Sequence, residues 1–398
     1  MSAKATTASD ILPVDGYRGA LAGRVWRPGL GPCVVAIREE GVIDISATCA
    51  TMSELAAGAD PARTLSGAAG ERIGSLAELV ANTPPDGRDG SKPWLLAPID
   101  LQVIKAAGVT FAVSMLERVI EERARGDAGA AAAIRAEVLR LVGDDLSRLR
   151  PGSPEALALK QVLVAQGAWS QYLEVGIGPD AEVFTKAPTL SAVGPFMDAG
   201  LHPKSTWNNP EPEVVIVVTA DGRIVGATTL GNDVNLRDFE GRSALLLSKA
   251  KDNNASCALG PFLRFFDETF SLDDVRRTTV TLSVEGEDGF RLEGSSSLTK
   301  ISRDPADLVA QTLGPHHQYP DGFVLFLGTM FAPTQDRDEP GMGFTHKRGD
   351  IVTIAAPELG ALVNRIRPSS DCEPWAFGLG ALMRNLAARG LITTNQAD

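Results

Sequence analysis

Two glutamates stand two residues apart in the segment NNPEPEVVIVV, residues 208–218, at the start of a run of β-branched residues. Side chains two apart on a strand point to the same face, so Glu211 and Glu213 would repel each other unless a cation lies between them. The alternative is a solvated strand edge that is acidic by accident. The pair therefore raises the hypothesis of a cation site, which needs further oxygen ligands.

The next segment supplies a third carboxylate. Asp221 and Gly222 lie between two β-branched runs, which is the signal of a hairpin. A hairpin returns the chain to the end of the sheet where it began, so we expect Asp233 beside the glutamate pair. Carboxylate ligands with positions left open for water or substrate suit Mg²⁺ or Mn²⁺ better than zinc.

A lysine follows in the segment KDNNASCALGPF, which begins at Lys251. A lysine beside a metal-bound carbonyl can donate a hydrogen bond to a developing enolate, or move a proton if its pKa is lowered. The alternative, a surface lysine, is the commoner case for a lysine taken by itself.

Composition limits the kinds of partner. The chain has 398 residues and a net charge of −12 with no basic run, which argues against nucleic acid and is compatible with a divalent cation. The four scattered cysteines form no CxxC pair, so we expect neither a cysteine zinc site nor disulfides. Without an apolar run of membrane-spanning or signal-peptide length, we expect a soluble cytoplasmic protein.

The pattern along the chain predicts three segments. Residues 1–93 are expected to form a β-rich N-terminal domain that ends in a Pro- and Gly-rich linker. Residues 94–180 are expected to form a connecting segment that contains two or three helices at 114–172. One of these helices is expected to start at Ser153 and Pro154. This segment is either a lid or a packing and dimerisation arm. Residues 181–398 are expected to be short strands separated by turns.

Several segments together resemble the fumarylacetoacetate hydrolase family. They are PEPEVVIVV, GATTLGNDVNLRDFEG, KDNNASCALGPF, FLGTMFAP and RGDIVTIAAPELGALVNRI. The resemblance implies an α+β, β-rich fold with a rolled mixed sheet, a smaller N-terminal β-containing domain and a helical insertion. It implies Glu211, Glu213 and Asp233 as metal ligands, Lys251 at the keto or enolate oxygen of a 2-keto acid, and Thr329 at the substrate's carboxylate. Members usually assemble as dimers or dimers of dimers, so a homodimer or homotetramer is expected.

One segment departs from the family's hydrolases. They carry G-x-N-Y-x-x-H-x-x-E, whose His and Glu activate water, whereas residues 108–117 read GVTFAVSMLE. Phe111 replaces the Tyr and Ser114 replaces the His, while Glu117 remains. An unassisted serine cannot take a proton from water near neutral pH, so the general base for hydrolysis is missing. We expect Phe111 and Ser114 to contact substrate instead.

Other details are similar to the family's dehydratases of 2-keto-3-deoxy sugar acids. In that branch a Glu precedes an F-x-K-A segment, and Glu182 in EVFTKA holds this position. The resemblance implies that Glu182 is a catalytic acid or base, although a salt-bridged strand residue is the alternative, and we expect Lys186 to be structural. Arg237 matches an arginine that the hydrolases use near substrate, or it pairs with Asp238.

The expected function is metal-dependent dehydration of a 2-keto-3-deoxypentonate, derived from D-xylonate or D-arabinonate, to 2,5-dioxopentanoate. Glu182 or Lys251 would take a proton from carbon 3, and the hydroxyl at carbon 4 would leave as water. No water nucleophile is needed, in agreement with the missing histidine. The alternatives are a hydrolase of an acylpyruvate or 2,4-diketo acid, and a non-catalytic protein that binds a metal–ligand complex.

Overall fold

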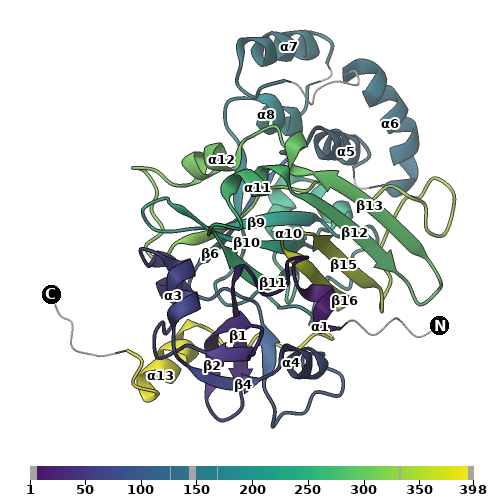
Figure 1. Cartoon of the computed structure of the whole chain (residues 1–398). Coiled ribbons are helices and arrows are strands. Elements are labelled where there is room, and N and C mark those ends of the chain that lie inside the picture. Colours follow the sequence, from purple (N-terminus) through teal and green to yellow (C-terminus); the bar gives the residue numbers. More distant parts are fainter. Residues whose placement is uncertain (1–6, 126, 143–148, 168, 331–332, 393–398) are drawn as a thin grey trace.

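Two β-sheets and a group of helices form the molecule (Figure 1). The structure is a computed structural model, which describes residues 7–125, 127–142, 149–167, 169–330 and 333–392. The mixture of sheets and helices is the α+β class that the sequence predicted.

The larger sheet carries the acidic residues of interest. Its strands, in order across the sheet, are β4 (Glu71–Gly74), β3 (Gly41–Asp44), β2 (Gly31–Arg38), β1 (Ala20–Arg27), β11 (Cys257–Phe265), β10 (Ile224–Asp233), β9 (Pro212–Val218), β14 (Phe323–Phe326), β6 (Val103–Gly108) and β7 (Glu182–Ala187). Strand β5 (Trp94–Leu96) also pairs with β1. Neighbouring strands are antiparallel except β14 and β6, which are parallel.

The smaller sheet packs against one face of the larger one. Its order is β13 (Arg291–Ser297), β12 (Thr279–Glu285), β15 (Ile351–Ala356), β16 (Gly360–Pro368) and β8 (Asp198–Leu201). Val214 and Ile216 of β9 share a core with Leu282 and Val352, whereas Val215 of β9 belongs to a second core on the opposite face. Strand β9 is buried along its whole length because both of its faces are covered.

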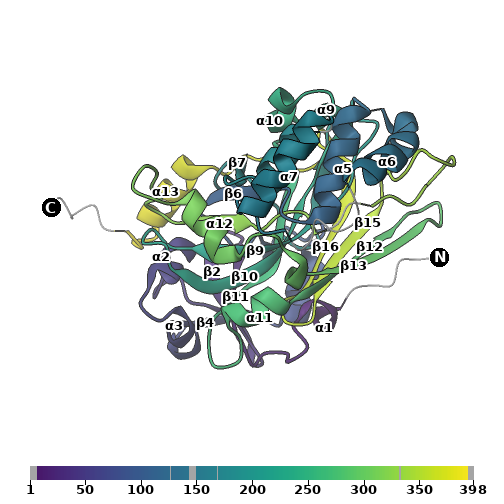
Figure 2. The same ribbon diagram turned by 90° about the horizontal axis from the view of Figure 1, so that it is seen from above.

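Helices α5 (Ala112–Arg123), α6 (Ala128–Val142), α7 (Pro154–Ala165) and α8 (Gln171–Ile177) lie together at the top of Figure 1, and Figure 2 looks down from that end. The sequence predicted two or three helices here, and the described residues form four. Helix α7 begins where expected: the Ser153 side chain caps it by accepting from the Ala156 N–H, and Pro154 is its first residue.

The other helices lie between strands or near the ends of the chain. They are α1 (Ala8–Ile11), α2 (Met52–Ala57), α3 (Pro61–Gly67), α4 (Leu76–Asn82), α9 (Arg237–Glu240), α10 (Leu247–Lys251), α11 (Leu272–Arg277), α12 (Pro305–Thr312) and α13 (Leu379–Ala388). Among the described helices, none is long and apolar enough to cross a membrane. All four cysteines are buried and free.

The N-terminal strands are continuous with the rest of the larger sheet. Strand β1 pairs with β11, with Ala20 opposite Phe265. Helix α13 returns to the same region, where Asn385 Nδ2 donates to the Leu30 carbonyl at 2.8 Å. Strands of the first predicted segment, residues 1–93, and of the third, residues 181–398, therefore belong to one sheet. The division of the chain at residues 93 and 180 stays a prediction.

Candidate metal centre and active site

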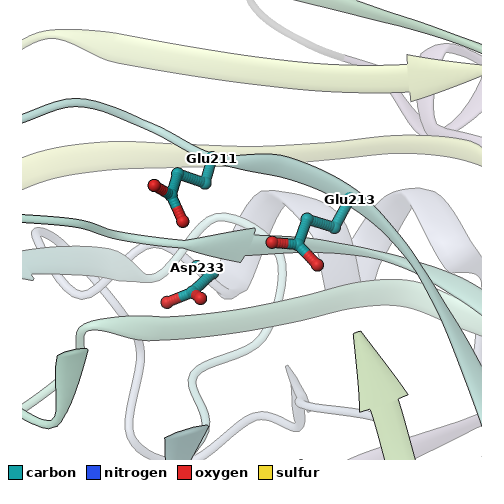
Figure 3. A group of neighbouring side chains, drawn as sticks. All are labelled: Glu211, Glu213 and Asp233. Carbon is teal, nitrogen blue, oxygen red and sulfur yellow. The ribbon is translucent and has the colours of Figure 1, made fainter. Parts of the chain in front are cut away.

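The β9–β10 hairpin brings the three expected carboxylates together. Glu211 directly precedes β9, Glu213 lies on it opposite Gly231 of β10, and Asp233 ends β10. One carboxylate oxygen from each residue lies within 4.8 Å of the others, and all three side chains are buried (Figure 3). Buried carboxylates this close together form an oxygen donor set that could hold a hard divalent cation.

The carboxylates of the pair differ in their electrostatic surroundings. Burial raises the pKa of Glu213 well above its ordinary value, and Asp233 and Glu211 raise it further. Burial also acts to raise the pKa of Glu211, but Arg118 and Lys251 outweigh it and lower that pKa to about 2. Glu213 is therefore surrounded mainly by other carboxylates, whereas Arg118 and Lys251 keep Glu211 ionised.

Two buried lysines contact the donor set. The Nζ atom of Lys251 lies 3.1 Å from Asp233 Oδ2 and also donates to Glu211. The Nζ atom of Lys186 lies 2.9 Å from Asp233 Oδ1 and donates to the Lys251 carbonyl. Lys186 is fully buried, so it ties β7 to the end of α10 from inside the protein.

The charges around the donor set do not balance within the described part of the chain. Six carboxylates are gathered with four cations, which leaves an excess of two negative charges when all are ionised. The carboxylates are Glu121, Glu182, Glu211, Glu213, Asp233 and Glu240, and the cations are Arg118, Lys186, Arg237 and Lys251. The raised pKa values of Glu213 and Glu182 indicate that protons offset this excess when no cation is bound, and a divalent cation would replace them, so these residues fit Mg²⁺ or Mn²⁺.

A small cavity adjoins the carboxylates. Its volume is about 10 Å³, and its wall includes the three carboxylates, Glu182, Lys251, Ser114 and Thr329. Thr329 Oγ1 donates to Glu213 at 3.3 Å, and Ser114 Oγ donates to the Thr329 carbonyl at 2.5 Å. The cavity wall thus brings together four residues that the sequence predicted for the site but that lie far apart in the chain: Ser114 of α5, Glu182 of β7, Lys251 of α10 and Thr329 after β14.

Phe111 is placed differently from the other expected substrate contacts. It lies 2% exposed in the core between the two sheets, and its backbone bridges to Ile301. Among the described residues, it does not belong to the cavity wall. Ser114 and Thr329 therefore remain the predicted substrate contacts, whereas Phe111 packs in the core at the start of α5.

The carboxylate of Glu117 is engaged away from the cavity. Arg135 of α6 donates to both of its oxygens, at 3.0 and 2.6 Å. Glu117 is therefore a bridge between α5 and α6, and the cavity wall has Ser114 where the hydrolases carry a histidine.

Glu182 has the environment of a proton-transfer group. It is half-buried at the start of β7, opposite Gly108 of β6, and it lines the cavity. Burial, and then the nearby Glu240, raise the pKa of Glu182 to about 7. A carboxyl group with such a pKa can accept and return a proton near neutral pH.

Sequence reasoning missed Arg118 and Glu240. Arg118 of α5 contacts Glu211, lies 3.1 Å from Glu240 and donates to Glu121 at 2.6 Å. Residues 114, 118 and 121 follow the spacing of one helix face, which is a signal that could have found Arg118. Glu240 gave no such signal, because only the fold brings α9 to the cavity.

Arg237 does not pair with Asp238, and its place near substrate stays a prediction. Its Nε atom donates to Asn209 at 2.8 Å and lies 3.2 Å from Glu121, whereas Asp238 accepts from Ser205 at 2.8 Å. Arg237 therefore extends the buried charge network that begins at Glu211 and Arg118.

Comparison with known proteins agrees with this arrangement. The family described as fumarylacetoacetate (FAA) hydrolase C-terminal matches residues 169–367, half of the chain. The chain belongs to the fumarylacetoacetate hydrolase family. The matched residues include the three carboxylates, Glu182, Lys251 and Thr329.

Similar curated proteins of this family are enzymes. A 2-dehydro-3-deoxy-D-arabinonate dehydratase of Saccharolobus solfataricus is 32% identical over 189 residues, which cover 47% of this chain and 58% of the relative. A probable 2-keto-3-deoxyxylonate dehydratase of Haloferax volcanii is 29% identical over 195 residues, covering 49% and 63%. A mitochondrial oxaloacetate tautomerase of Rattus norvegicus is 27% identical over 199 residues, covering 46% and 58%. The chain thus spans less than two thirds of each relative's length.

Solved structures share the fold over most of the chain. A 2-keto-3-deoxyarabinonate dehydratase has a TM-score of 0.60 at 22% identity, covering 87% of this chain and 99% of that one. A structure of 2-keto-3-deoxy-D-arabinonate dehydratase complexed with magnesium and 2,5-dioxopentanoate has a TM-score of 0.59 at 21% identity, with the same coverage. The expected fold of the fumarylacetoacetate hydrolase family is confirmed.

Proposed function

We propose that this protein is a metal-dependent dehydratase that converts a 2-keto-3-deoxypentonate to 2,5-dioxopentanoate. The observation that carries the proposal is the composition of the cavity wall: the three carboxylates that could hold a metal, Glu182 and Lys251 are present, whereas Ser114 stands where the family's hydrolases carry a histidine and Glu117 is bound to Arg135. Relatives that dehydrate such sugar acids support it.

The metal site supplies the activation. Mg²⁺ or Mn²⁺ held by Glu211, Glu213 and Asp233 would polarise the keto group of the substrate and make its carbon 3 acidic. Thr329 and the Gly328 N–H, which donates to Glu213 at 2.7 Å, orient that ligand. Lys251 lies between two of the carboxylates as a hydrogen-bond donor, and we assign it to the keto or enolate oxygen of the substrate.

The proton transfers belong to Glu182 in this proposal. Its carboxylate accepts a proton from carbon 3, and the electrons of that C–H bond form a double bond between carbons 3 and 4. The C4–O bond breaks, and the same carboxyl group returns the proton to the departing hydroxyl, which leaves as water. The product of this step is an enone that keeps the hydroxyl on carbon 5. Loss of a proton from carbon 5 and gain of a proton at carbon 3 move the double bond to carbons 4 and 5. This enol then gains a proton at carbon 4 and loses its hydroxyl proton to give the aldehyde of 2,5-dioxopentanoate, so the net change is the loss of one water.

The experiment is a product assay with each candidate substrate. Purified protein with Mg²⁺ is mixed separately with 2-keto-3-deoxy-D-xylonate, 2-keto-3-deoxy-D-arabinonate, an acylpyruvate and oxaloacetate. We expect a deoxypentonate to lose the mass of one water, and EDTA or Glu211→Ala to stop the reaction. Pyruvate from the acylpyruvate without any dehydration would identify a hydrolase instead, and turnover of oxaloacetate alone would identify a tautomerase. Full activity of Glu211→Ala would refute the metal assignment.

Assembly and location complete the proposal. A homodimer or homotetramer in the cytoplasm stays a prediction from the sequence. Light scattering on the purified protein measures the first, and a fluorescent fusion measures the second.

A further inference from the structure

A second cavity lies away from the metal site. Its volume is about 280 Å³, and its wall is formed mainly by β1, β5, residues 190–198 and the segment 372–377 that precedes α13. Strand β1 and helix α13 lie at the bottom of Figure 1, whereas helices α5–α8 lie at the top. Within the part of the chain that the structure describes, no residue lines both this cavity and the one at the carboxylates. The mechanism above therefore does not use the second cavity.

Four aromatic side chains gather in the wall of this cavity, and none of them is buried. Trp26 of β1 and Trp94 of β5 are opposite residues in an antiparallel pair, so their rings stack with centroids 5.9 Å apart. Phe377 meets Trp26 edge to face with centroids 5.2 Å apart, and Trp375 is 47% exposed. Three of the chain's five tryptophans thus line one cavity. Partly exposed indole rings offer a flat apolar surface on which another aromatic ring can stack.

Two residues of the wall have a strained backbone. Leu190 and Ala255 have φ values of 69° and 60°, which residues with a side chain rarely adopt. Such strain is kept where the surrounding structure requires it, and it is concentrated at ligand-binding positions. Asn254, beside Ala255, donates from Nδ2 to the Glu373 carbonyl at 3.3 Å. This bond joins the strained segment to the segment before α13, so two parts of the wall hold each other in place.

The charged side chains of the wall are paired with other groups of the protein. They are Arg24, Arg88, Asp198 and Glu373, which carry no net charge. Arg88 Nη1 donates to Glu373 at 3.1 Å, and Asp198 accepts from Arg365 at 2.8 Å. Arg24 Nη1 donates to a backbone carbonyl at 2.5 Å. An ion that entered the cavity would lose its hydration without gaining an unpaired opposite charge, so the wall disfavours anions such as 2-oxo acids.

We propose that this cavity binds an uncharged planar aromatic molecule of one or two fused rings, with the indole rings of Trp26, Trp94 and Trp375 as its contact surface. The volume of about 280 Å³ lies near the lower end of the range for small-molecule pockets, about 300–1,000 Å³, which limits the size of the ligand. The aromatic rings select a planar ligand, and the balanced charges select a neutral one. The inference does not rest on the proposed function, because among the described residues the two cavities share no wall.

The test compares matched probes by ligand-observed NMR titration of the full chain. Indole and indole-3-carboxylate differ in charge, whereas phenol and cyclohexanol differ in planarity. We expect indole to bind at least about tenfold more tightly than indole-3-carboxylate, and phenol to bind more tightly than cyclohexanol.

Tryptophan variants locate the binding site. Trp375→Ala should weaken indole binding about tenfold, whereas Trp375→Phe, which keeps an aromatic ring, should retain most of it. Trp26→Leu gives a second, independent loss of stacking surface. Trp169→Leu changes a tryptophan outside the cavity wall and is the matched control, which should bind indole as the wild type does. Circular dichroism and thermal melting show that each variant is folded.

A charge variant tests the selection of a neutral ligand. The Glu373 side chain is 50% exposed, so Glu373→Gln should leave the fold intact. It removes the acid that is paired with Arg88. We expect indole-3-carboxylate to bind this variant up to about fivefold more tightly than the wild type, with the affinity for indole unchanged.

Three results would overturn the inference. The first is no measurable indole binding, or equal affinity for indole in the wild type, Trp375→Ala and Trp26→Leu. The second is loss of indole binding in Glu211→Ala, which would place indole at the metal site. The third is a lower molar mass of Trp375→Ala in light scattering together with no indole binding by the wild type, which would make this surface a contact between copies of the chain.

Discussion

Glu211 and Glu213 have the same side chain two residues apart, yet their pKa values move in opposite directions. Burial acts to raise both, but Arg118 and Lys251 lower the pKa of Glu211, whereas Glu213 faces Asp233 and Glu211. The pair and its lysine could be predicted because family motifs are contiguous in the chain. Glu240 could not, since its position depends on contacts between α5, α9 and the end of β10, whereas Arg118 could have been found from its helical spacing to Ser114.

At the residue scale, the first prediction concerns the pH dependence of Glu182. The carboxyl group must be ionised to accept the proton from carbon 3, so kcat/KM should rise with pH through its pKa. Burial and Glu240 raise that pKa to about 7, and a bound cation lowers the pKa of a neighbouring acid. We expect an acid limb with a midpoint at or below about 7, measured from kcat/KM between pH 5 and 9.

Glu182→Gln tests the origin of that limb. The variant should lose at least about a hundredfold in rate, the usual contribution of a general base. A variant that kept both the rate and the limb would assign the proton transfer to another residue.

At the scale of elements, α5 connects the helices to the cavity. One of its sides carries Ser114 and Arg118 into the cavity wall, while Glu117 bridges to Arg135 of α6. The sequence predicted helices here and a cap at Ser153, because periodicity and capping are local signals. It could not decide between a lid and an arm, because that depends on which side of each helix meets the rest of the protein.

The second prediction is that Glu117 is structural. Glu117→Gln removes the charge from a bidentate pair, which should lower the free energy of unfolding by about 1 kcal/mol. Because the pair lies outside the cavity wall, kcat should change less than about threefold. Urea unfolding and the product assay measure the two quantities, and a large loss of kcat with unchanged stability would restore Glu117 to the chemistry.

The third prediction concerns the segment before β15. His346 is buried, and its Nδ1 atom lies 3.1 Å from Asp350 Oδ2. Burial lowers its pKa despite the opposing effect of Asp350. The unfolded chain, with a histidine pKa of about 6.5, therefore binds a proton more readily than the folded chain, and stability should fall as the pH drops below about 6.5.

Urea unfolding of the wild type and His346→Gln at pH 7.5 and pH 5.5 measures this effect. The variant should lose less free energy of unfolding between the two pH values than the wild type does. Equal losses in the two proteins would place the acid sensitivity elsewhere.

At the scale of the whole molecule, metal binding should stabilise a protein that is already folded. Lysines 186 and 251 and Arg118 offset part of the negative charge at the donor set, and the cores on both faces of β9 are apolar. The sequence predicted the family and the fold class, because motifs spread over half of the chain occur in order. It did not predict that the N-terminal strands continue the larger sheet, since a pairing between residues over two hundred positions apart leaves no local pattern.

The fourth prediction is a thermal shift. Mn²⁺ at about one hundred times its Kd adds roughly 2.7 kcal/mol to the free energy of unfolding, which should raise the Tm by a few degrees in differential scanning calorimetry. Glu213→Gln replaces one of the three carboxylates by a neutral amide, so its Tm should rise much less at the same concentration of Mn²⁺. An equal shift in wild type and variant would indicate binding elsewhere.

The pairing of β1 with β11 also sets an order of events during synthesis. Residues Ala20–Ala22 pair with Leu263–Phe265. At roughly 5–20 residues per second, a ribosome needs on the order of ten to fifty seconds to make the chain between them. During that time the edge of β1 lacks its partner, and an unpaired strand edge is a template for association with other chains. Nascent chains of this protein should therefore need protection by a chaperone until β11 emerges, and fragments that end before Cys257 should aggregate.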